Sequence, residues 1–460
     1  MFMGGIQMKS NHVNMLSGSI TKGLLSMTIP IMIMNVMQSL FSITDMTVLR
    51  FFSDDRAVGA VGACGMLIIL STSLLIGISA GANVIVARRI GAGDRERADK
   101  AVMTSLLFSV VGGLVLMLIG VTSSETFLKM TNCPDSLLPQ AIKYFKIYFY
   151  GVPVLMFYNF CASILRATGD TKRPMYFLII GGLIKVLFTI FFVTVLDVDV
   201  EGVALATIIT NVIASLLAFC TLLKFQNVVR VNFKQMKFDL AELKDILYIG
   251  VPAGLQSSLY SLANVVITVA VNGFGEAATT GIAIANQFDG ILYQISYAPS
   301  LAVTPYIAQN MGAGNIKRVK KTLIRAVFIT TAFGTTFGSL SAFFSEQLSS
   351  LLSSTPAVIA FSQQKMIIIS STYFICGINE VMGGVLRGMG KPIIPTVATL
   401  IFMCLLRFVW VYAIFPLCPN LTFLYAVWPI GWILSIITLL VAYFITMSKL
   451  EAKKCSANLF

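Results

Sequence analysis

Long apolar windows recur along almost the whole chain, and they limit its possible folds more than any other feature. A helix needs about 20 apolar residues to cross the ~30 Å hydrocarbon core of a bilayer. Twelve windows reach this length, near residues 24–50, 57–83, 99–121, 139–165, 174–195, 201–224, 246–272, 278–305, 321–344, 357–384, 393–416 and 424–447. The sequence therefore predicts an all-α polytopic membrane protein with twelve transmembrane helices.

The composition agrees with this class. Of the 460 residues, 57% are hydrophobic and 12% are charged, whereas a soluble domain carries about 25% charged residues. A net charge of +13 could indicate nucleic acid, but the basic residues gather in short clusters between apolar windows, which is the positive-inside pattern. The eight cysteines form no CxxC or Cys/His grouping, so neither a metal site nor a disulfide framework is indicated.

The clusters of basic residues separate the two sides of the membrane. One side holds Lys22, the clusters at 88–100, 166–173, 224–244, 317–325 and 387–391, and the C-terminal lysines. We assign this side to the cytoplasm, with both termini, of a multi-pass protein in the cell (inner) membrane. Arg166 and Arg387 count here as cytoplasmic loop charges, and Lys365 as a charge on the opposite side.

The two halves of the chain repeat. Gly91-Ala-Gly-Asp94 returns as Gly312-Ala-Gly-Asn315, and Leu165-Arg-Ala-Thr-Gly169 returns as Leu386-Arg-Gly-Met-Gly390. Both pairs are separated by the same spacing, which we call the repeat offset. Because this offset spans six helices, the halves have the same orientation, and such parallel repeats are related by an axis along the membrane normal. We predict a cytoplasmic tail (1–23), an N-lobe (24–224), a cytoplasmic linker (225–245), a C-lobe (246–447) and a second cytoplasmic tail (448–460).

One acid stands out in the first apolar window. A carboxylate at membrane depth costs roughly 2.5–3.5 kcal/mol on insertion scales, so Asp45 should face a cavity or a partner. The alternative is an acid near the helix end that reaches the headgroup region.

Several motifs together resemble the multidrug and toxic compound extrusion (MATE) family, over residues 20 to 450. They are Gln38-x6-Asp45, Gly91-Ala-Gly, Asn159-x6-Arg166-Ala-Thr-Gly, Gly202-Val-Ala-Leu-Ala-Thr207, Gln309-Asn-Met-Gly-Ala-Gly314 and Leu386-Arg-Gly-Met-Gly-Lys-Pro392. The resemblance implies a two-lobed secondary antiporter, driven by H+ or Na+, that exports bulky amphipathic compounds, often cations. It implies cation-coupling roles for Asp45 and Thr207. The expected substrate contacts are Asn35, Gln38, Asn159, Tyr260, Asn264, Gln287 and Gln294.

The chain departs from the family on its fifth helix. Where the family commonly has Asn-x3-Asp, this sequence has Lys185-x3-Thr189. Lys185 lies roughly 16 Å into its helix, too deep to reach water easily, so it needs an anion. Asp45 is the natural partner, and the sequence predicts an ion pair in which Lys185 takes the place of a bound cation. The alternative leaves Lys185 alone in a water-filled crevice.

The second half offers a further group of candidates for coupling. Asp289 lies about 16 Å into the eighth helix, on a polar strip with Gln287 and Gln294, and could either face a cavity or be satisfied by hydrogen bonds between helices. Arg407 is deep in the eleventh helix and needs a counter-charge, for which Asp289 is the nearest candidate. We expect Glu380 to be a water-reaching end or gate residue.

Three functions compete on this evidence. The first is a cation-coupled exporter of amphipathic small molecules. The second is a flippase for lipid-linked saccharides of the same wider superfamily, for which more than twelve helices would be expected. The third is a membrane-embedded lipid-phosphate enzyme, which would need paired carboxylates or histidines at a membrane face. The Gly-Ala-Gly loops lack the Gly-Lys-Ser/Thr ending of a nucleotide loop, so we expect no nucleotide site. We also expect a monomer with no cofactor and no nucleic-acid partner.

Overall fold

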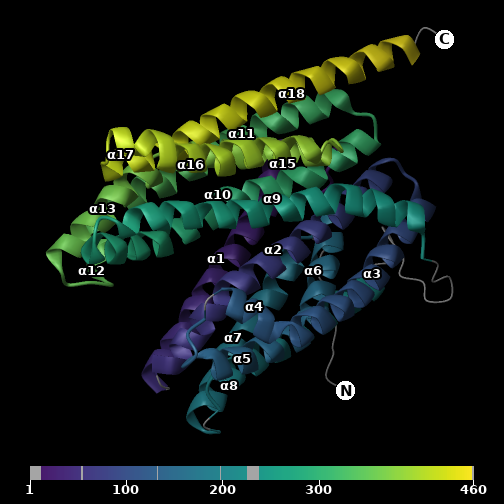
Figure 1. Ribbon diagram of the computed structural model, residues 1–460. Coiled ribbons are helices and arrows are strands. Elements are labelled where there is room, and N and C mark those ends of the chain that lie inside the picture. The colour runs from purple at the N-terminus through teal and green to yellow at the C-terminus, as the bar shows by residue number, and fades with distance from the viewer. Residues whose placement is uncertain (1–11, 53–54, 132, 197, 225–237, 458–460) are drawn as a thin grey trace.

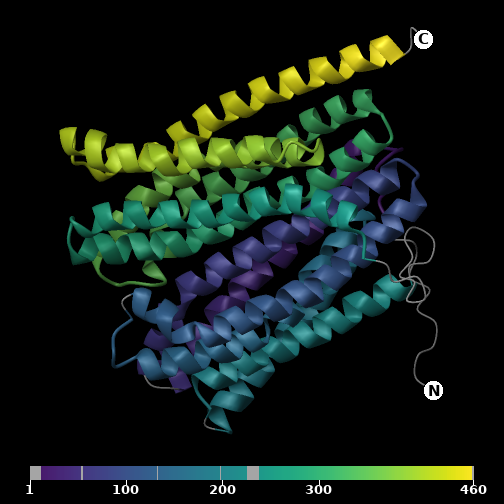
Figure 2. The ribbon, with the colours of Figure 1, turned by 45° about the vertical axis from the view of Figure 1, so that its right-hand side comes forward.

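The computed structural model describes residues 12–52, 55–131, 133–196, 198–224 and 238–457. Helices make up almost all of these residues and form two bundles that lie side by side (Figures 1 and 2). The N-lobe contains α1 (Ile20–Phe52), α2 (Asp55–Gly91), α3 (Arg95–Thr122), α4 (Ser124–Met130), α5 (Leu138–Tyr150), α6 (Val152–Ala167), α7 (Lys172–Thr194) and α8 (Val200–Lys224).

The C-lobe repeats this order of helices. It contains α9 (Leu240–Asn272), α10 (Glu276–Gly312), α11 (Ile316–Phe343), α12 (Ser345–Ser350), α13 (Pro356–Ser370), α14 (Tyr373–Gly388), α15 (Ile393–Thr399), η2 (Leu400–Leu405), α16 (Leu406–Val409), η3 (Trp410–Ile414), η4 (Phe415–Leu417), α17 (Leu421–Tyr425) and α18 (Val427–Ala457). Two of these segments, η2 and η3, are π-helical and lie on either side of the short helix α16.

The predicted twelve crossings and two lobes are confirmed. In the described part of the chain, nine helices are long and apolar enough to cross a bilayer, and the bent pairs α5–α6 and α13–α14 each add one. The remaining crossing is α10, which has 37 residues and is less apolar because Asn286, Gln287 and Asp289 lie on it.

Several helices continue beyond the predicted windows. The helix α2 continues to Gly91 instead of ending at residue 83, α9 begins at Leu240 inside the predicted linker, and α18 continues to Ala457 into the predicted C-terminal tail. The windows counted apolar residues only, whereas a helix can extend into water on charged residues such as Glu451, which pairs with Lys320. Linker residues 225–237 lie outside the described chain.

Local structure also repeats at the sequence offset. The fourth crossing bends by 44° between α5 and α6, at Gly151, and the tenth bends by 48° between α13 and α14, before Thr372. The first bend precedes Pro153, which has no backbone N–H to donate. At the second bend, the hydroxyl of Thr372 donates to the Ile369 carbonyl at 2.8 Å and competes with the helical hydrogen bonds. Gly151 and Thr372 are separated by the repeat offset, so two different sequences produce the same bend at equivalent positions.

The lobes meet through a reciprocal glycine contact. A Cβ on Gly91 would lie 2.0 Å from the carbonyl oxygen of Gln309, and a Cβ on Gly312 would lie 2.1 Å from that of Arg88. Gly91 and Gly312, like Arg88 and Gln309, are repeat partners, so the contact is isologous and a two-fold axis passes through it. The C-terminal ends of α2 and α10 both lie at this contact, so the two helices run in the same direction. The two-fold axis therefore runs along the helices, which cross the membrane. The predicted parallel repeat is confirmed.

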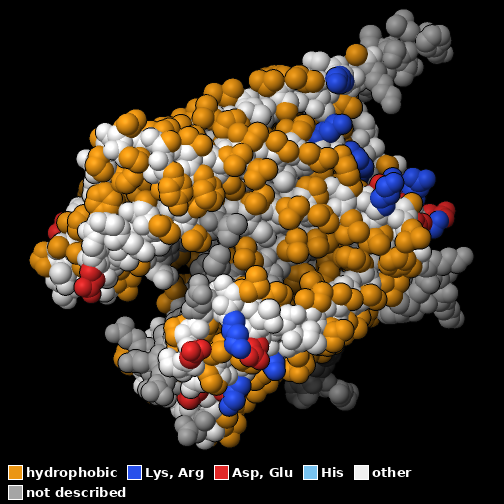
Figure 3. All heavy atoms as spheres, viewed as in Figure 1, with side chains coloured by type: hydrophobic (Ala, Val, Ile, Leu, Met, Phe, Trp, Pro, Cys, Tyr) orange, Lys and Arg blue, Asp and Glu red, His pale blue; other side chains and the backbone are white. Residues whose placement is uncertain are grey.

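The lobes touch at one end and separate toward the other. At the end near this glycine contact, Arg89 pairs with Glu242 at 3.0 Å, and the Gln309 side chain donates to the Ala167 carbonyl at 2.7 Å. We call this the basic end, because the clusters of Lys and Arg gather there. Away from it the two bundles diverge (Figures 1 and 2), and the surface is hollowed between them (Figure 3).

Candidate functional site

A cavity of about 330 Å³ lies between the two lobes. Five of the seven residues expected to contact substrate line it, namely Asn35, Gln38 and Asn159 from the N-lobe and Tyr260 and Gln294 from the C-lobe. The other two do not line it. Asn264 accepts a hydrogen bond from Arg407 at 2.7 Å, and Gln287 lies on the exposed face of α10. The roles of all seven stay predictions.

Three tyrosines form one wall of this cavity. Tyr260 stacks on Tyr293 with ring centroids 5.7 Å apart, and Tyr293 stacks on Tyr297 at 5.7 Å with their planes 9° apart. The spacing of four residues from Tyr293 to Tyr297 places both rings on one face of α10. The result is a flat aromatic surface against which an apolar or planar molecule can pack.

Two arginines and a glutamate also line the cavity, which corrects two of our assignments. The sequence placed Arg166 and Arg387 in cytoplasmic loops, but they lie in the last turns of α6 and α14 and turn inward. Glu380, expected to be a water-reaching end or a gate residue, is buried and accepts a hydrogen bond from Tyr293 at 3.5 Å, so the water-reaching alternative is wrong and the gate stays a prediction. Arg166 and Arg387 are repeat partners, and the repeat offset was the signal that could have identified them as a cavity pair.

The predicted ion pair between α7 and α1 is present. The Lys185 ammonium lies 2.5 Å from a carboxylate oxygen of Asp45, and each side chain is 13% exposed. The second Asp45 oxygen, Oδ1, is buried and has no hydrogen-bond partner among the described residues. The pair thus holds α1 and α7 together inside the N-lobe while one oxygen keeps the capacity to accept a proton. Its role in coupling stays a prediction.

The two threonines expected beside this pair differ in their surroundings. Thr189, one turn beyond Lys185, is fully buried, and its hydroxyl has no partner among the described residues. Thr207 donates to the carbonyl of Val203 in its own helix at 3.0 Å. The structure thus brings Asp45 and Lys185 together and gives Thr207 a partner within α8. Arg50 stands five residues after Asp45, where the family usually has glycine, and its side chain lies outside the described set.

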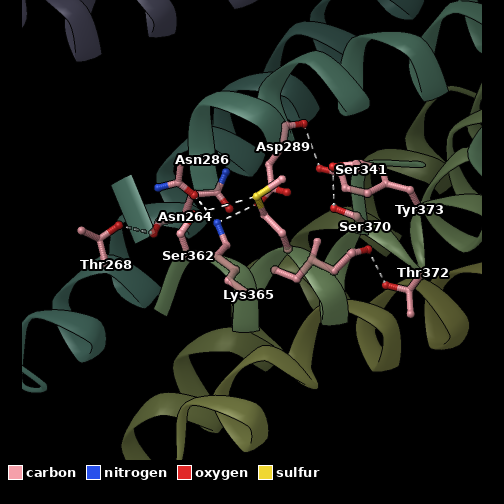
Figure 4. A network of polar contacts seen from close by, with 12 residues as sticks. Asn264, Thr268, Asn286, Asp289, Ser341, Ser362, Lys365, Ser370, Thr372 and Tyr373 are labelled. Carbon is pink, nitrogen blue, oxygen red and sulfur yellow. Dashed lines mark hydrogen bonds and ion pairs between the residues drawn. The ribbon is translucent and has the colours of Figure 1, made fainter. Parts of the chain in front are cut away.

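The C-lobe contains an ion pair that the sequence analysis missed. Lys365 of α13 lies 2.8 Å from Asp289 of α10 and is 3% exposed; it also hydrogen-bonds the side-chain oxygen of Asn286. Figure 4 shows the lysine reaching from its helix toward both residues. From the sequence, Lys365 is expected to be a loop charge, because this residue lies near the start of its apolar window. Asp289 is expected to be the counter-charge of Arg407 instead. The polar Ser and Gln residues just before Lys365 give no sequence pattern that predicts its burial.

Arg407 is buried without a carboxylate partner among the described residues. It donates to Asn264 of α9 at 2.7 Å and lies 5.2 Å from the ring centre of Tyr260 and 5.0 Å from that of Trp428, so cation–π contacts replace an ion pair. Its helix α16 is a four-residue turn between two π-helical segments, and such segments are frequent at functional sites. Arg407 lies one residue beyond the position that the repeat offset pairs with Lys185, so both lobes place a cation at nearly equivalent positions.

No group of three or more His, Cys, Asp or Glu side chains that could hold a metal ion occurs within the described ranges. The buried ionisable side chains described above are paired with one another or line the cavity, except Arg407, which contacts Asn264, Tyr260 and Trp428.

Two parallel-repeat lobes with a polar cavity between them and a buried ion pair in each define a secondary membrane transporter. The MatE family profile matches residues 30–191 and again residues 252–413, once per lobe. The chain belongs to the MatE family, as the motifs indicated.

Individual relatives are similar over most of their length. A probable multidrug resistance protein of Bacillus subtilis, YoeA, is 27% identical over 81% of this chain and 82% of its own. An FAD transporter of Shewanella oneidensis is 26% identical over 87% and 89%. Among solved structures, a MOP superfamily transporter from Pyrococcus furiosus has a TM-score of 0.89 at 20% identity, covering 96% of this chain and 99% of that one. This likeness shows the fold.

Proposed function

We propose that the protein exports amphipathic small molecules from the cytoplasm by alternating access, in exchange for entering protons. The observation that carries this proposal is the cavity between two lobes that are sealed at the basic end. By the positive-inside rule the basic end and both termini are cytoplasmic, so the cavity faces outward in this state. The relatives named as multidrug resistance proteins support export.

Protons fit the N-lobe better than sodium as the coupling ion. The Lys185 ammonium already occupies the position beside Asp45 where a cation would bind, and sodium would have to displace it. A proton on Asp45 would remove the negative charge and release Lys185, which weakens the contact of α1 with α7. The weaker contact would allow the N-lobe to change its packing and so drive the change of state. In this proposal the protein acts as a monomer and without a resident cofactor.

Transport by purified protein in liposomes tests the proposal. We expect efflux of at least one dye from a panel of anionic and cationic fluorescent dyes when a proton gradient is imposed. We expect no dye efflux when only a sodium gradient is imposed. The double variant Asp45→Asn/Lys185→Met should show no efflux driven by the proton gradient. Efflux driven by sodium alone would contradict the choice of ion, and movement of lipid-linked saccharide without any dye would favour the flippase.

A further inference from the structure

The two arginines of the cavity have more hydrogen-bond donors than the described residues fill. Arg166 donates to Ser163 at 2.7 Å, and Arg387 donates to Gln256 at 2.9 Å and to Ser300 at 3.3 Å. Each guanidinium carries five N–H donors. Neither forms an ion pair with a carboxylate of the described chain. Both therefore keep donors for a ligand that enters the cavity.

The charge of the cavity wall is positive. Glu380 is the one carboxylate among the described residues that line it, against two guanidiniums. Arg387 is 7% exposed, and the charge of Glu380 can balance only one of the two guanidiniums, so one cation of the wall lacks a matching anion, which is costly for a buried charge. Arg407 adds a third positive charge immediately behind the wall, since it stacks on Tyr260. A ligand with a negative group would balance this excess, whereas a cation would increase it.

Two buried amides on the wall also have unfilled hydrogen-bonding capacity. Asn35 and Asn379 are each 6% exposed, and both line the cavity. The Asn35 amide nitrogen and the Asn379 amide oxygen have no partner among the described residues. They come from opposite lobes, so a single ligand between the lobes could satisfy both. The wall therefore offers a ligand unfilled polar groups from both lobes.

From these observations we infer that the cavity binds planar aromatic anions, with the oxyanion on Arg166 and Arg387 and the ring system on the three stacked tyrosines. The inference rests on the export function proposed above and names its substrate class. Arginine suits this role because its planar fork binds carboxylate, sulfonate or phosphate oxygens in pairs. It differs from the cationic substrate that the family resemblance implies.

Binding of two dyes with the same ring system tests the charge preference directly. Carboxyfluorescein is an anion and rhodamine 6G is a cation, and both contain a xanthene ring. Fluorescence anisotropy with purified protein in detergent gives the affinity for each. We expect carboxyfluorescein to bind at least 10-fold more tightly than rhodamine 6G. Aromatic carboxylate, sulfonate and phosphate monoester competitors then distinguish the sources of the oxyanion.

Variants of Arg387 and Glu380 with opposite expected effects show whether these residues select the ligand by its charge or only support the fold. Arg387→Met should weaken carboxyfluorescein binding at least 10-fold and leave rhodamine 6G unchanged or tighter, and Arg387→Lys should restore part of the anion affinity. Glu380→Gln should act in the opposite direction and strengthen anion binding. Lys391→Met removes an exposed basic residue just beyond the end of α14 and should change neither affinity. Arg166→Met gives a second test if Arg387→Met does not fold.

The outcomes distinguish this inference from the proposed function. Tighter binding of rhodamine 6G, together with no effect of Arg387→Met and Arg166→Met on carboxyfluorescein, would overturn the anion site but leave an exporter of cations. Selective binding of carboxyfluorescein without gradient-driven movement of either dye in liposomes would support the anion site and contradict the export mechanism.

Discussion

At the scale of single residues, the pair of Asp45 and Lys185 is the feature with the largest expected energetic effect. Removing one member leaves a buried charge without its partner, which costs about 3–5 kcal/mol. We therefore expect Asp45→Asn and Lys185→Met each to lower the thermal stability of the detergent-solubilised protein more than the double variant does. The coupling energy of the double-mutant cycle should therefore be about 3 kcal/mol or more, because the double variant costs less than either single variant.

A matched cycle on an exposed pair controls for general effects of charge removal. Lys129 and Glu125 lie 2.6 Å apart on α4 and are each 60% exposed, and surface pairs contribute at most about 1 kcal/mol. If the changes at Asp45 and Lys185 are additive, like those expected on α4, the two charges do not support each other and the coupling proposal for the N-lobe fails.

The sequence could predict one of the two buried ion pairs and not the other. Lys185 lies in the middle of an apolar window, so burial and the need for a counter-charge follow from its depth. Lys365 lies near the start of its window, where a lysine usually reaches water, and its burial depends on how α13 packs against α10. Such packing is a property of the tertiary structure. For the same reason, the positions of Arg166 and Arg387 at helix ends predict loop charges, although both side chains line the cavity.

At the scale of helices, the contact of α2 with α9 depends on glycine. A Cβ on Gly77 would lie 2.1 Å from the backbone of Gly254, so Gly77→Ala should force the two helices apart. Overpacking of this kind costs about 1–3 kcal/mol, and we expect a clear loss in thermal stability. Gly290→Ala in α10 is the control, because its Cβ would meet nothing within 4 Å and alanine favours a helix by up to about 1 kcal/mol. Equal effects of both changes would contradict the close packing.

Residues 12–18 connect the two lobes at the basic end. Val13 donates its backbone N–H to the Gly169 carbonyl of the N-lobe at 3.2 Å, while Arg318 of the C-lobe donates to the carbonyls of Met15 at 2.9 Å and Ser17 at 2.8 Å. Met15 is 1% exposed. The segment therefore stabilises the state in which this end is closed.

Removing the arginine should loosen that segment. We expect Arg318→Gln to speed amide hydrogen exchange of residues 13–17 several-fold, because two carbonyl acceptors lose a charged donor. Lys317→Gln, a change at an exposed neighbour on the same helix, should leave the exchange rates unchanged. Unaltered exchange in both variants would show that contacts other than those of Arg318 hold the segment, such as the hydrogen bond from Asn310 to the Met15 carbonyl.

At the scale of the whole molecule, the repeat offset predicted most of the architecture. It correctly implied two lobes of equal orientation and an axis along the membrane normal, because equivalent sequences fold alike. It did not predict which end would be closed, since that depends on contacts between lobes, such as Gly91 with Gln309, that no sequence pattern expresses. Because the lobes are closed at the basic end, they separate at the other end and leave the cavity between them.

Alternating access requires the basic end to open, so a bond across it should stop transport. In a variant with its native cysteines replaced by serine, we expect Arg88→Cys and Met389→Cys to react with a short, reducible bifunctional crosslinker, since the Arg88 guanidinium reaches the Met389 carbonyl at 3.1 Å. Transport should stop and return on reduction, whereas dye binding should persist because the outward cavity stays open. Lys320→Cys with Glu451→Cys, an adjacent pair within the C-lobe, controls for crosslinking itself. Undiminished transport by fully crosslinked Arg88→Cys/Met389→Cys protein would show that the lobes need not separate at this end.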